Sequence, residues 1–270
     1  MRTKRYGAIF LLAAACLGAP SWAQDAPPIR AFDAATIEKL GLAIYRQDQE
    51  AAQATDLLLK NHPDAELQKQ NLRGWVVDPT PDGDVIRFIR DDGGLQAAYD
   101  VAFKDGAAWL LAPLTPVLTD QENAQFAARN LAATSIARPC AQQYNLVSLQ
   151  DPEGDGWLVW ALAVAPAPGS WFIGGNYRFT ISRDGSRVLQ ADALSRGCLL
   201  MAPQPPPPGS AVAAQVSSQL VSDIPVETAV LVNLQSGIPM FVATPDRTVW
   251  QIEQGRMSKA GTVPGTPPAQ

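Results

Sequence analysis

The hydrophobic pattern of this chain changes from a helical to an extended period twice, and this change limits the folds that the chain can adopt. Residues 34–60 carry apolar side chains at three- and four-residue steps, which predicts an amphipathic helix with one buried side. Asp33 is placed to cap the N-terminus of this helix, and His62-Pro63 ends it. Short β-type segments separated by turn sequences follow at residues 75–77, 84–90, 95–103 and 107–112.

The second change of period begins at Thr119. The sequence "TDQE" at residues 119–122 is a capping box, in which the Glu122 side chain can bond back to the Thr119 N–H. The helix that it opens is expected to stop at Pro139. Further β-type segments follow at residues 144–149, 157–165, 171–182 and 187–193. The order predicts an α+β fold with two tandem units, each a helix followed by an antiparallel meander.

Similar turn sequences recur at similar places in the two units. "DPTPDG" at residues 78–83 and "DPEGDG" at residues 151–156 begin 73 residues apart. The later turns "KDG" at residues 104–106 and "RDG" at residues 183–185 lie 79 residues apart. These correspondences favour an internal duplication of about 75 residues. Coincidence is the alternative, because Asp-Gly turns are common in antiparallel proteins.

The acidic turns also raise the question of a calcium site. "DPEGDG" approximates the first six positions of an EF-hand loop, but Leu162 stands where a bidentate Glu is required. In the first copy the same position is Ile89. The chain has a single histidine, His62, and neither a phosphate-binding loop nor a dinucleotide-binding motif. The sequence therefore predicts no metal and no cofactor, and it identifies no catalytic residue.

A proline run divides the tandem units from a C-terminal module. After "PQPPPPG", a short helix capped by Ser210 and three strands at residues 226–234, 239–243 and 248–252 are expected. The full expected division is a signal peptide (1–23), a first α+β unit (24–115), a second α+β unit (116–202), a Pro-rich linker (203–209), a small C-terminal helix-plus-strands module (210–259) and a disordered tail (260–270).

The N-terminus is typical of a secretory signal peptide. Basic residues 2–5 precede a short apolar segment, and small residues suit cleavage after Ala23. The expected location is therefore periplasmic or secreted. Cys16 offers an alternative, a lipoprotein cleaved before this cysteine and anchored through it, which is the one case in which a membrane partner is expected.

The net charge disfavours nucleic acid as a partner. The chain carries 21 Lys and Arg against 26 Asp and Glu, and residues 1–23 hold three of the basic residues and no acidic one. The exported chain would therefore have a net charge of −8, which repels polyanions.

Two cysteines remain after the expected cleavage. In an oxidising compartment, Cys140 and Cys198 are expected to form a disulfide, which would stabilise the fold by roughly 4 kcal/mol in a chain-entropy model. Two separate buried thiols are the alternative.

The uncharged residues 157–177 hold three tryptophans, Trp157, Trp160 and Trp171. Core packing of two buried strands explains such a composition. Alternatively, these aromatic side chains share a sheet face and contact a ligand.

These observations favour a non-enzymatic binding or interaction protein of a bacterial-type cell envelope, whose partner is an envelope protein or polymer. One alternative is a hydrolase of envelope polymers that uses a carboxylate pair, and another is a lipid-anchored structural protein. Two carboxyl groups converging in a concave site with a raised pKa would favour the hydrolase.

Overall fold

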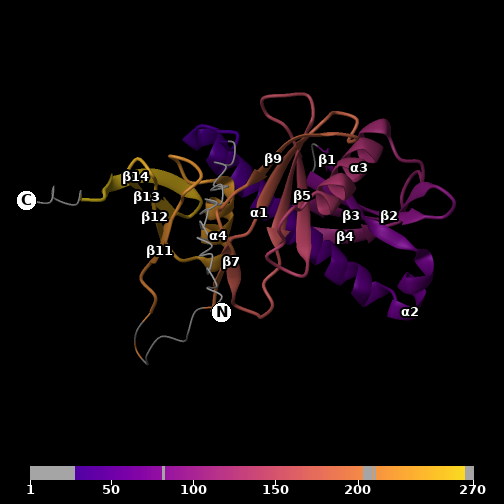
Figure 1. Ribbon diagram of the computed structural model, residues 1–270. Coiled ribbons are helices and arrows are strands. Elements are labelled where there is room, and N and C mark those ends of the chain that lie inside the picture. The colour runs from indigo at the N-terminus through magenta and orange to yellow at the C-terminus, as the bar shows by residue number, and fades with distance from the viewer. Residues whose placement is uncertain (1–27, 81–82, 203–208, 210, 265–270) are drawn as a thin grey trace, which may run out of the picture.

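The computed structural model describes residues 28–80, 83–202, 209 and 211–264, and these residues form an α+β fold. The described part contains four α-helices and four small sheets. Figure 1 shows the C-terminal sheet at one end of the molecule and the first sheet at the other, with the long first helix extending between them. The predicted signal peptide and Cys16 lie outside the described residues.

The first helix, α1 (Ala34–Asn61), contributes to two separate hydrophobic cores. Its N-terminal half packs Ile37 and Ile44 into the core shared with the C-terminal sheet, while Ala54 and Leu58 pack against the first sheet. The predicted cap is confirmed, because the Asp33 carboxylate accepts a 2.7 Å hydrogen bond from the Thr36 N–H. A short helix α2 (Asp64–Leu67) follows.

The first sheet is an antiparallel meander in the strand order β1-β2-β3-β4. Its strands are β1 (Leu72–Thr80), β2 (Gly83–Asp91), β3 (Leu95–Lys104) and β4 (Ala107–Leu111). The face toward α1 is apolar and includes Val77, Ile86, Phe88, Val101 and Phe103. The side chains of this face form a core with α1, and the opposite face also carries buried side chains, Val76, Ile89 and Ala97.

The second sheet has the strand order β5-β6-β8-β9. Its strands are β5 (Tyr144–Gln150), β6 (Trp157–Ala163), β8 (Tyr177–Ile181) and β9 (Val188–Ala193). The single strand predicted over residues 171–182 is wrong, because β7 (Trp171–Gly174) leaves this sheet and pairs with β10 (Leu199–Met201). The chain bends between β7 and β8 at Gly175, whose φ of 101° is unfavourable for a residue with a side chain.

Helix α3 (Asp120–Thr134) lies between the two meanders. Its predicted capping box at Thr119 is confirmed. Ala128 and Ala132 pack against the second sheet, whereas Phe126 packs against the first. Small alanine side chains allow close approach of the helix to one sheet, so that α3 can contact both.

The C-terminal part differs from the expected order of elements. Residues predicted to continue a helix from Ser210, itself outside the described residues, instead form strand β11 (Gln215–Ser218). The strand predicted over residues 226–234 is also wrong, because the structure has helix α4 (Glu227–Ser236) there. Three consecutive residues of α4, Val230 to Val232, are buried. A helix that is buried on nearly all sides lacks the amphipathic period that distinguishes it from a buried strand.

The C-terminal sheet has the strand order β11-β12-β13-β14, with β11 parallel to β12 and the other pairs antiparallel. The remaining strands are β12 (Met240–Ala243), β13 (Thr248–Glu253) and β14 (Arg256–Thr262). Strand β14 thus extends into the segment expected to be a tail from residue 260.

The C-terminal sheet and the second meander share one hydrophobic core. This core joins Trp160 of β6, Val230 of α4 and Met240 of β12, all of which are fully buried. Buried charges reinforce it, because the Arg178 guanidinium binds Asp192 at 2.7 Å and Glu227 at 2.9 Å. The Trp160 indole N–H also donates to Glu227, at 2.7 Å. The Pro-rich segment lies mostly outside the described residues, and the domain division remains a prediction.

The four recurring turns occupy corresponding corners of the two meanders. "DPTPDG" and "DPEGDG" stand at the β1–β2 and β5–β6 connections, and "KDG" and "RDG" stand at the β3–β4 and β8–β9 connections. In the second acidic turn, Asp151 binds the Arg30 guanidinium at 2.9 Å, so its carboxylate serves a structural contact. An internal duplication stays a prediction, because a shared strand order does not show common ancestry.

Candidate functional site

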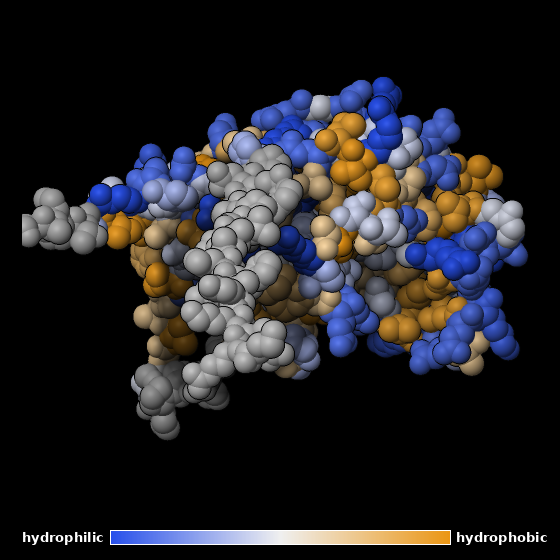
Figure 2. Space-filling view, in the orientation of Figure 1, coloured by the Kyte–Doolittle hydropathy of each residue, from blue (hydrophilic) through white to orange (hydrophobic). Residues whose placement is uncertain are grey.

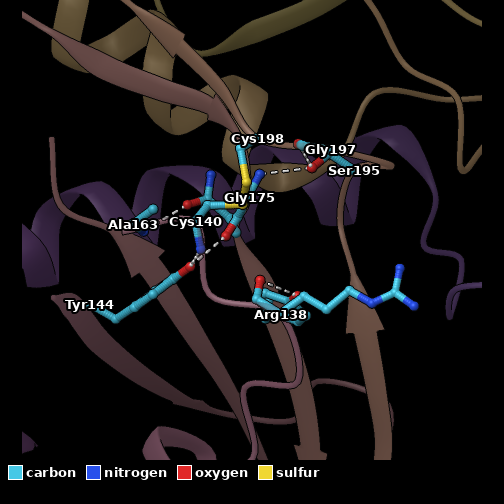
Figure 3. The surroundings of a disulfide bond; sticks show 10 residues. Arg138, Cys140, Tyr144, Ala163, Gly175, Ser195, Gly197 and Cys198 are labelled. Atoms are coloured by element: carbon cyan, nitrogen blue, oxygen red, sulfur yellow. Dashed lines mark hydrogen bonds between the residues drawn. A yellow bond between two sulfur atoms is a disulfide. The ribbon is translucent and has the colours of Figure 1, made fainter. Parts of the chain in front are cut away.

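The predicted disulfide between Cys140 and Cys198 is confirmed, with a Cα–Cα distance of 5.4 Å. Figure 3 shows how neighbouring polar groups hold the two cysteine segments against the bend after β7. The Tyr144 hydroxyl accepts from the Cys140 N–H at 2.7 Å and donates to the Gly175 carbonyl at 3.2 Å. The Ser195 hydroxyl accepts from the Gly175 N–H at 2.7 Å. The bridge therefore joins the α3–β5 connection to the β9–β10 connection.

Gly175 explains why the sequence "IGGN" occurs at this point. A Cβ atom at position 175 would lie 2.6 Å from the Cys140 Cβ and 2.7 Å from its Sγ. Real Cβ atoms do not approach so closely, and the positive φ of this residue disfavours a side chain independently. The glycine thus makes room for the disulfide.

The three tryptophans do not share a face. Trp157 is 5% exposed and packs toward α3, with its indole N–H donating to the Arg183 carbonyl at 3.1 Å. Trp160 is fully buried on the opposite face of β6, in the core with α1 and α4. Trp171 is partly buried against that same core. These positions give Trp157 and Trp160 roles in packing.

A carboxyl pair lies in a surface hollow of about 790 Å³ between α1 and the β1–β2 and β3–β4 ends of the first sheet. The Glu50 carboxyl lies next to Asp84, and Arg46 Nη2 lies 3.1 Å from Asp84 Oδ2. Burial, together with the nearby Asp84 charge, raises the pKa of Glu50 to about 7. At neutral pH this pair can therefore hold a proton that an ordinary glutamate would release.

A second cavity, of about 440 Å³, lies where α1, β1, α3 and β5 meet. It is the junction between the two meanders, where four elements that are distant in sequence supply the walls. We call it the junction cavity, and its polar or aromatic lining residues include Asp48, Asp56, Arg73, Trp75, Arg129, Asn130, Tyr144 and Asn145.

Arg129 of α3 is the unusual residue of the junction cavity. Its guanidinium carbon lies 3.6 Å from the centre of the Trp75 ring, and the residue is 8% exposed. Its Nε and Nη1 atoms are buried and have no hydrogen-bond partner among the described residues. Burial without a compensating carboxylate lowers the pKa of Arg129 to about 9. Stacking on an aromatic ring offsets part of the desolvation cost but satisfies no N–H group.

Two other charged residues of the junction cavity, Asp48 and Arg73, have polar partners. Asp48 accepts hydrogen bonds from Asn145 at 3.2 Å and from Gln235 at 3.4 Å, and burial raises its pKa. Arg73 is half exposed and lies 3.6 Å from an Asp91 carboxylate oxygen. Arg129 on α3 thus differs from Arg73 on β1 in lacking an acceptor, which is the arrangement expected of a site for an anion.

Sequence patterns did not identify Arg129, Glu50 or Asp84. Arg129 lies on the α3 face that also carries Glu122 and Gln125, two other buried polar residues. The recurrence of polar residues at positions 122, 125 and 129, in steps of three and four, was a signal that this face of the helix is distinct. In the sequence, this polar face looks like one exposed to solvent. It is buried because the first sheet packs against it, on the side of the helix opposite the alanines.

No protein-family model, no curated protein and no solved structure matches this chain. Within the described ranges, no group of three or more His, Cys, Asp or Glu side chains is arranged to hold a metal ion. The same ranges contain no helix that is long and apolar enough to cross a membrane. The disulfide is consistent with an oxidising, extracytoplasmic location.

Proposed function

We propose that the protein is an exported, non-enzymatic binding protein of a bacterial-type cell envelope, and that it binds an anionic group of an envelope protein or polymer in the junction cavity. The observation that carries the proposal is the buried guanidinium of Arg129, which lines the cavity without an acceptor among the described side chains. An unpaired buried charge destabilises a protein, so its presence in a cavity favours a role in binding.

The surface of the molecule supports a localised site. Figure 2 shows hydrophobic residues in several separate areas between hydrophilic ones on the face drawn. The part of that face that the grey atoms leave visible shows no single broad apolar area of the kind that would by itself indicate an obligate partner.

Site-directed crosslinking in cells tests the proposal. A photoreactive residue at Asn130, an exposed position on the cavity wall, is expected to capture one recurrent envelope component, and capture is expected to fall at least tenfold when Arg129→Gln is added. The same reactive residue at Val216, exposed on the distant edge strand β11, is the matched control. Equal capture from both positions, or capture that does not depend on Arg129, would contradict the proposal.

A hydrolase of envelope polymers is a second candidate, favoured by the carboxyl pair of Glu50 and Asp84 in its hollow. In this alternative Glu50 donates a proton to a leaving group and Asp84 assists as its neighbour. Activity on purified envelope polymers should then fall at least 100-fold in Glu50→Gln, while the exposed control Glu253→Gln retains it. An absence of turnover by the wild-type protein would exclude this alternative.

The lipid-anchored alternative depends on Cys16, outside the described residues. Incorporation of radiolabelled fatty acid that disappears in Cys16→Ala would support it. A protein that stays unlabelled, or remains labelled after the substitution, would count against it.

A further inference from the structure

The guanidinium of Arg129 is oriented before any ligand arrives. Its plane is held by the Trp75 ring, with the guanidinium carbon 3.6 Å from the ring centre, and α3 holds the stem of the side chain in the junction. Its unpaired atoms Nε and Nη1 belong to different edges of the guanidinium, so each edge has a donor to satisfy. A planar anion with two oxygens can meet two parallel N–H groups of one such edge.

The charges around Arg129 favour an anion with one negative charge over an anion with two. Asp48 and Asp56 line the same cavity, and Arg73 is engaged by Asp91. A phosphate monoester carries a charge close to −2 at neutral pH and would be repelled by these acidic neighbours. A carboxylate carries one charge, which the single unpaired cation can neutralise.

The dimensions and lining of the cavity limit the rest of the ligand. A volume of about 440 Å³ lies at the small end of ligand sites in proteins. The side-chain amides of Asn130 and Asn145 on its walls can exchange hydrogen bonds with a peptide-like group. The acidic side chains favour a neutral or cationic neighbour for the carboxylate.

We infer that the junction cavity binds a single carboxylate group carried by an α-amino acid or by the C-terminal end of a peptide, with Arg129 binding the carboxylate edge-on above Trp75. This inference rests on the proposed function as a binding protein and names the ligand chemistry of the same site. A free amino acid and a peptide end share this chemistry, and the experiment below separates them.

Calorimetric titration of the purified protein tests the inference with a matched pair of probes. Acetyl-alanyl-alanine should bind at least tenfold more tightly than its C-terminal amide, because the two differ only in the carboxylate. Inorganic phosphate should bind more weakly than the acid. Binding of free alanine that is tighter than that of the peptide acid would identify the amino acid as the source of the carboxylate, whereas tighter binding of the peptide acid would identify the chain end. Either order supports the inference.

Variants separate recognition by Arg129 from a general effect on folding. Arg129→Gln should weaken binding of the acid at least tenfold, and Arg129→Lys should lie between it and the wild type, because an ammonium cannot donate along a planar edge. Arg256→Gln, at an exposed arginine outside the junction cavity that is paired with Glu38, should bind within about twofold of the wild type. Arg129→Met should unfold at no lower urea concentration than the wild type, since it removes a buried unpaired charge.

Several results would overturn the inference. One is binding of acetyl-alanyl-alanine and its amide with equal affinity, and another is binding of phosphate as tight as that of the peptide acid. Unchanged binding of the acid by Arg129→Gln would also contradict it, as would a failure of the protein to bind both free alanine and the peptide acid. If crosslinking from Asn130 nevertheless remains dependent on Arg129, the proposed function stands and only the carboxylate inference fails. If the acid binds but no envelope component is captured in cells, the inference stands and the proposed function fails.

Discussion

The carboxyl pair makes a quantitative prediction about stability and pH. Glu50 has a pKa of about 7 in the folded protein and an ordinary value of 4.5, because burial and Asp84 favour its protonated form. Replacing it by glutamine in Glu50→Gln preserves the shape and hydrogen-bonding capacity of the neutral acid while removing the titration. The variant should therefore resemble the protonated wild type at every pH.

The sign of the effect follows from proton binding. Between pH 4.5 and 7 the folded protein keeps a proton on Glu50 that the unfolded chain releases, so the stabilisation from this group is present below pH 4.5 and is lost as the pH rises to 7. The interval between the two pKa values corresponds to at most about 3.4 kcal/mol. Because the Glu50 side chain is only partly buried, we reduce this for solvent screening to about 1.5 kcal/mol.

Urea unfolding followed by tryptophan fluorescence measures the effect. The free energy of unfolding of Glu50→Gln minus that of the wild type should rise by about 1.5 kcal/mol between pH 4.5 and pH 8. Taking this difference cancels the titrating groups that do not contact Glu50, such as Asp48, because they are the same in both proteins. The exposed control Glu253→Gln should show a difference that changes little with pH. A flat difference for Glu50→Gln, or one that falls as the pH rises, would refute the reasoning.

Further predictions concern the disulfide and the buried charges. The double variant Cys140→Ser with Cys198→Ser should lose about 2–4 kcal/mol in urea unfolding, and the oxidised wild type, denatured, should show no titratable thiol from this pair. Gly175→Ala should lose more than about 2 kcal/mol, because its Cβ would meet Cys140 at a positive φ; unchanged stability would contradict the close approach. Arg178→Leu should lose about 3–5 kcal/mol by leaving Asp192 and Glu227 buried without their cation, and thermal unfolding measures this loss. A loss below about 1 kcal/mol would show that these carboxyl groups find water or become neutral.

Local signals in the sequence predicted several elements correctly. Asp33 and the Thr119 capping box mark the starts of α1 and α3, because a helix cap is a contact between residues three positions apart. The turn sequences mark the hairpin connections for the same reason. Helix α4 was missed, since Val230 to Val232 face neighbours on all sides and lose the period on which the prediction depends.

The candidate sites were less predictable than the elements. Arg129 and Trp75 are 54 residues apart in sequence and meet only because α3 packs against the outer edge of the first sheet. Glu50 and Asp84 meet only because α1 covers the beginning of β2. The residues next to a carboxylate or guanidinium in the sequence do not show whether the folded protein buries it. Its pKa and its lack of hydrogen-bond partners therefore cannot be inferred from the sequence.

The sequence by itself determined the α+β class, the two meanders with their turns, the helix caps and the pairing of Cys140 with Cys198. These features depend on contacts between close neighbours or on the chemistry of two remaining cysteines. Only the tertiary structure decided that the C-terminal sheet shares a core with the second meander and that Arg129 is buried without an acceptor. The physical reason is that burial and charge pairing depend on which distant surfaces meet, and no local pattern of residues specifies that meeting.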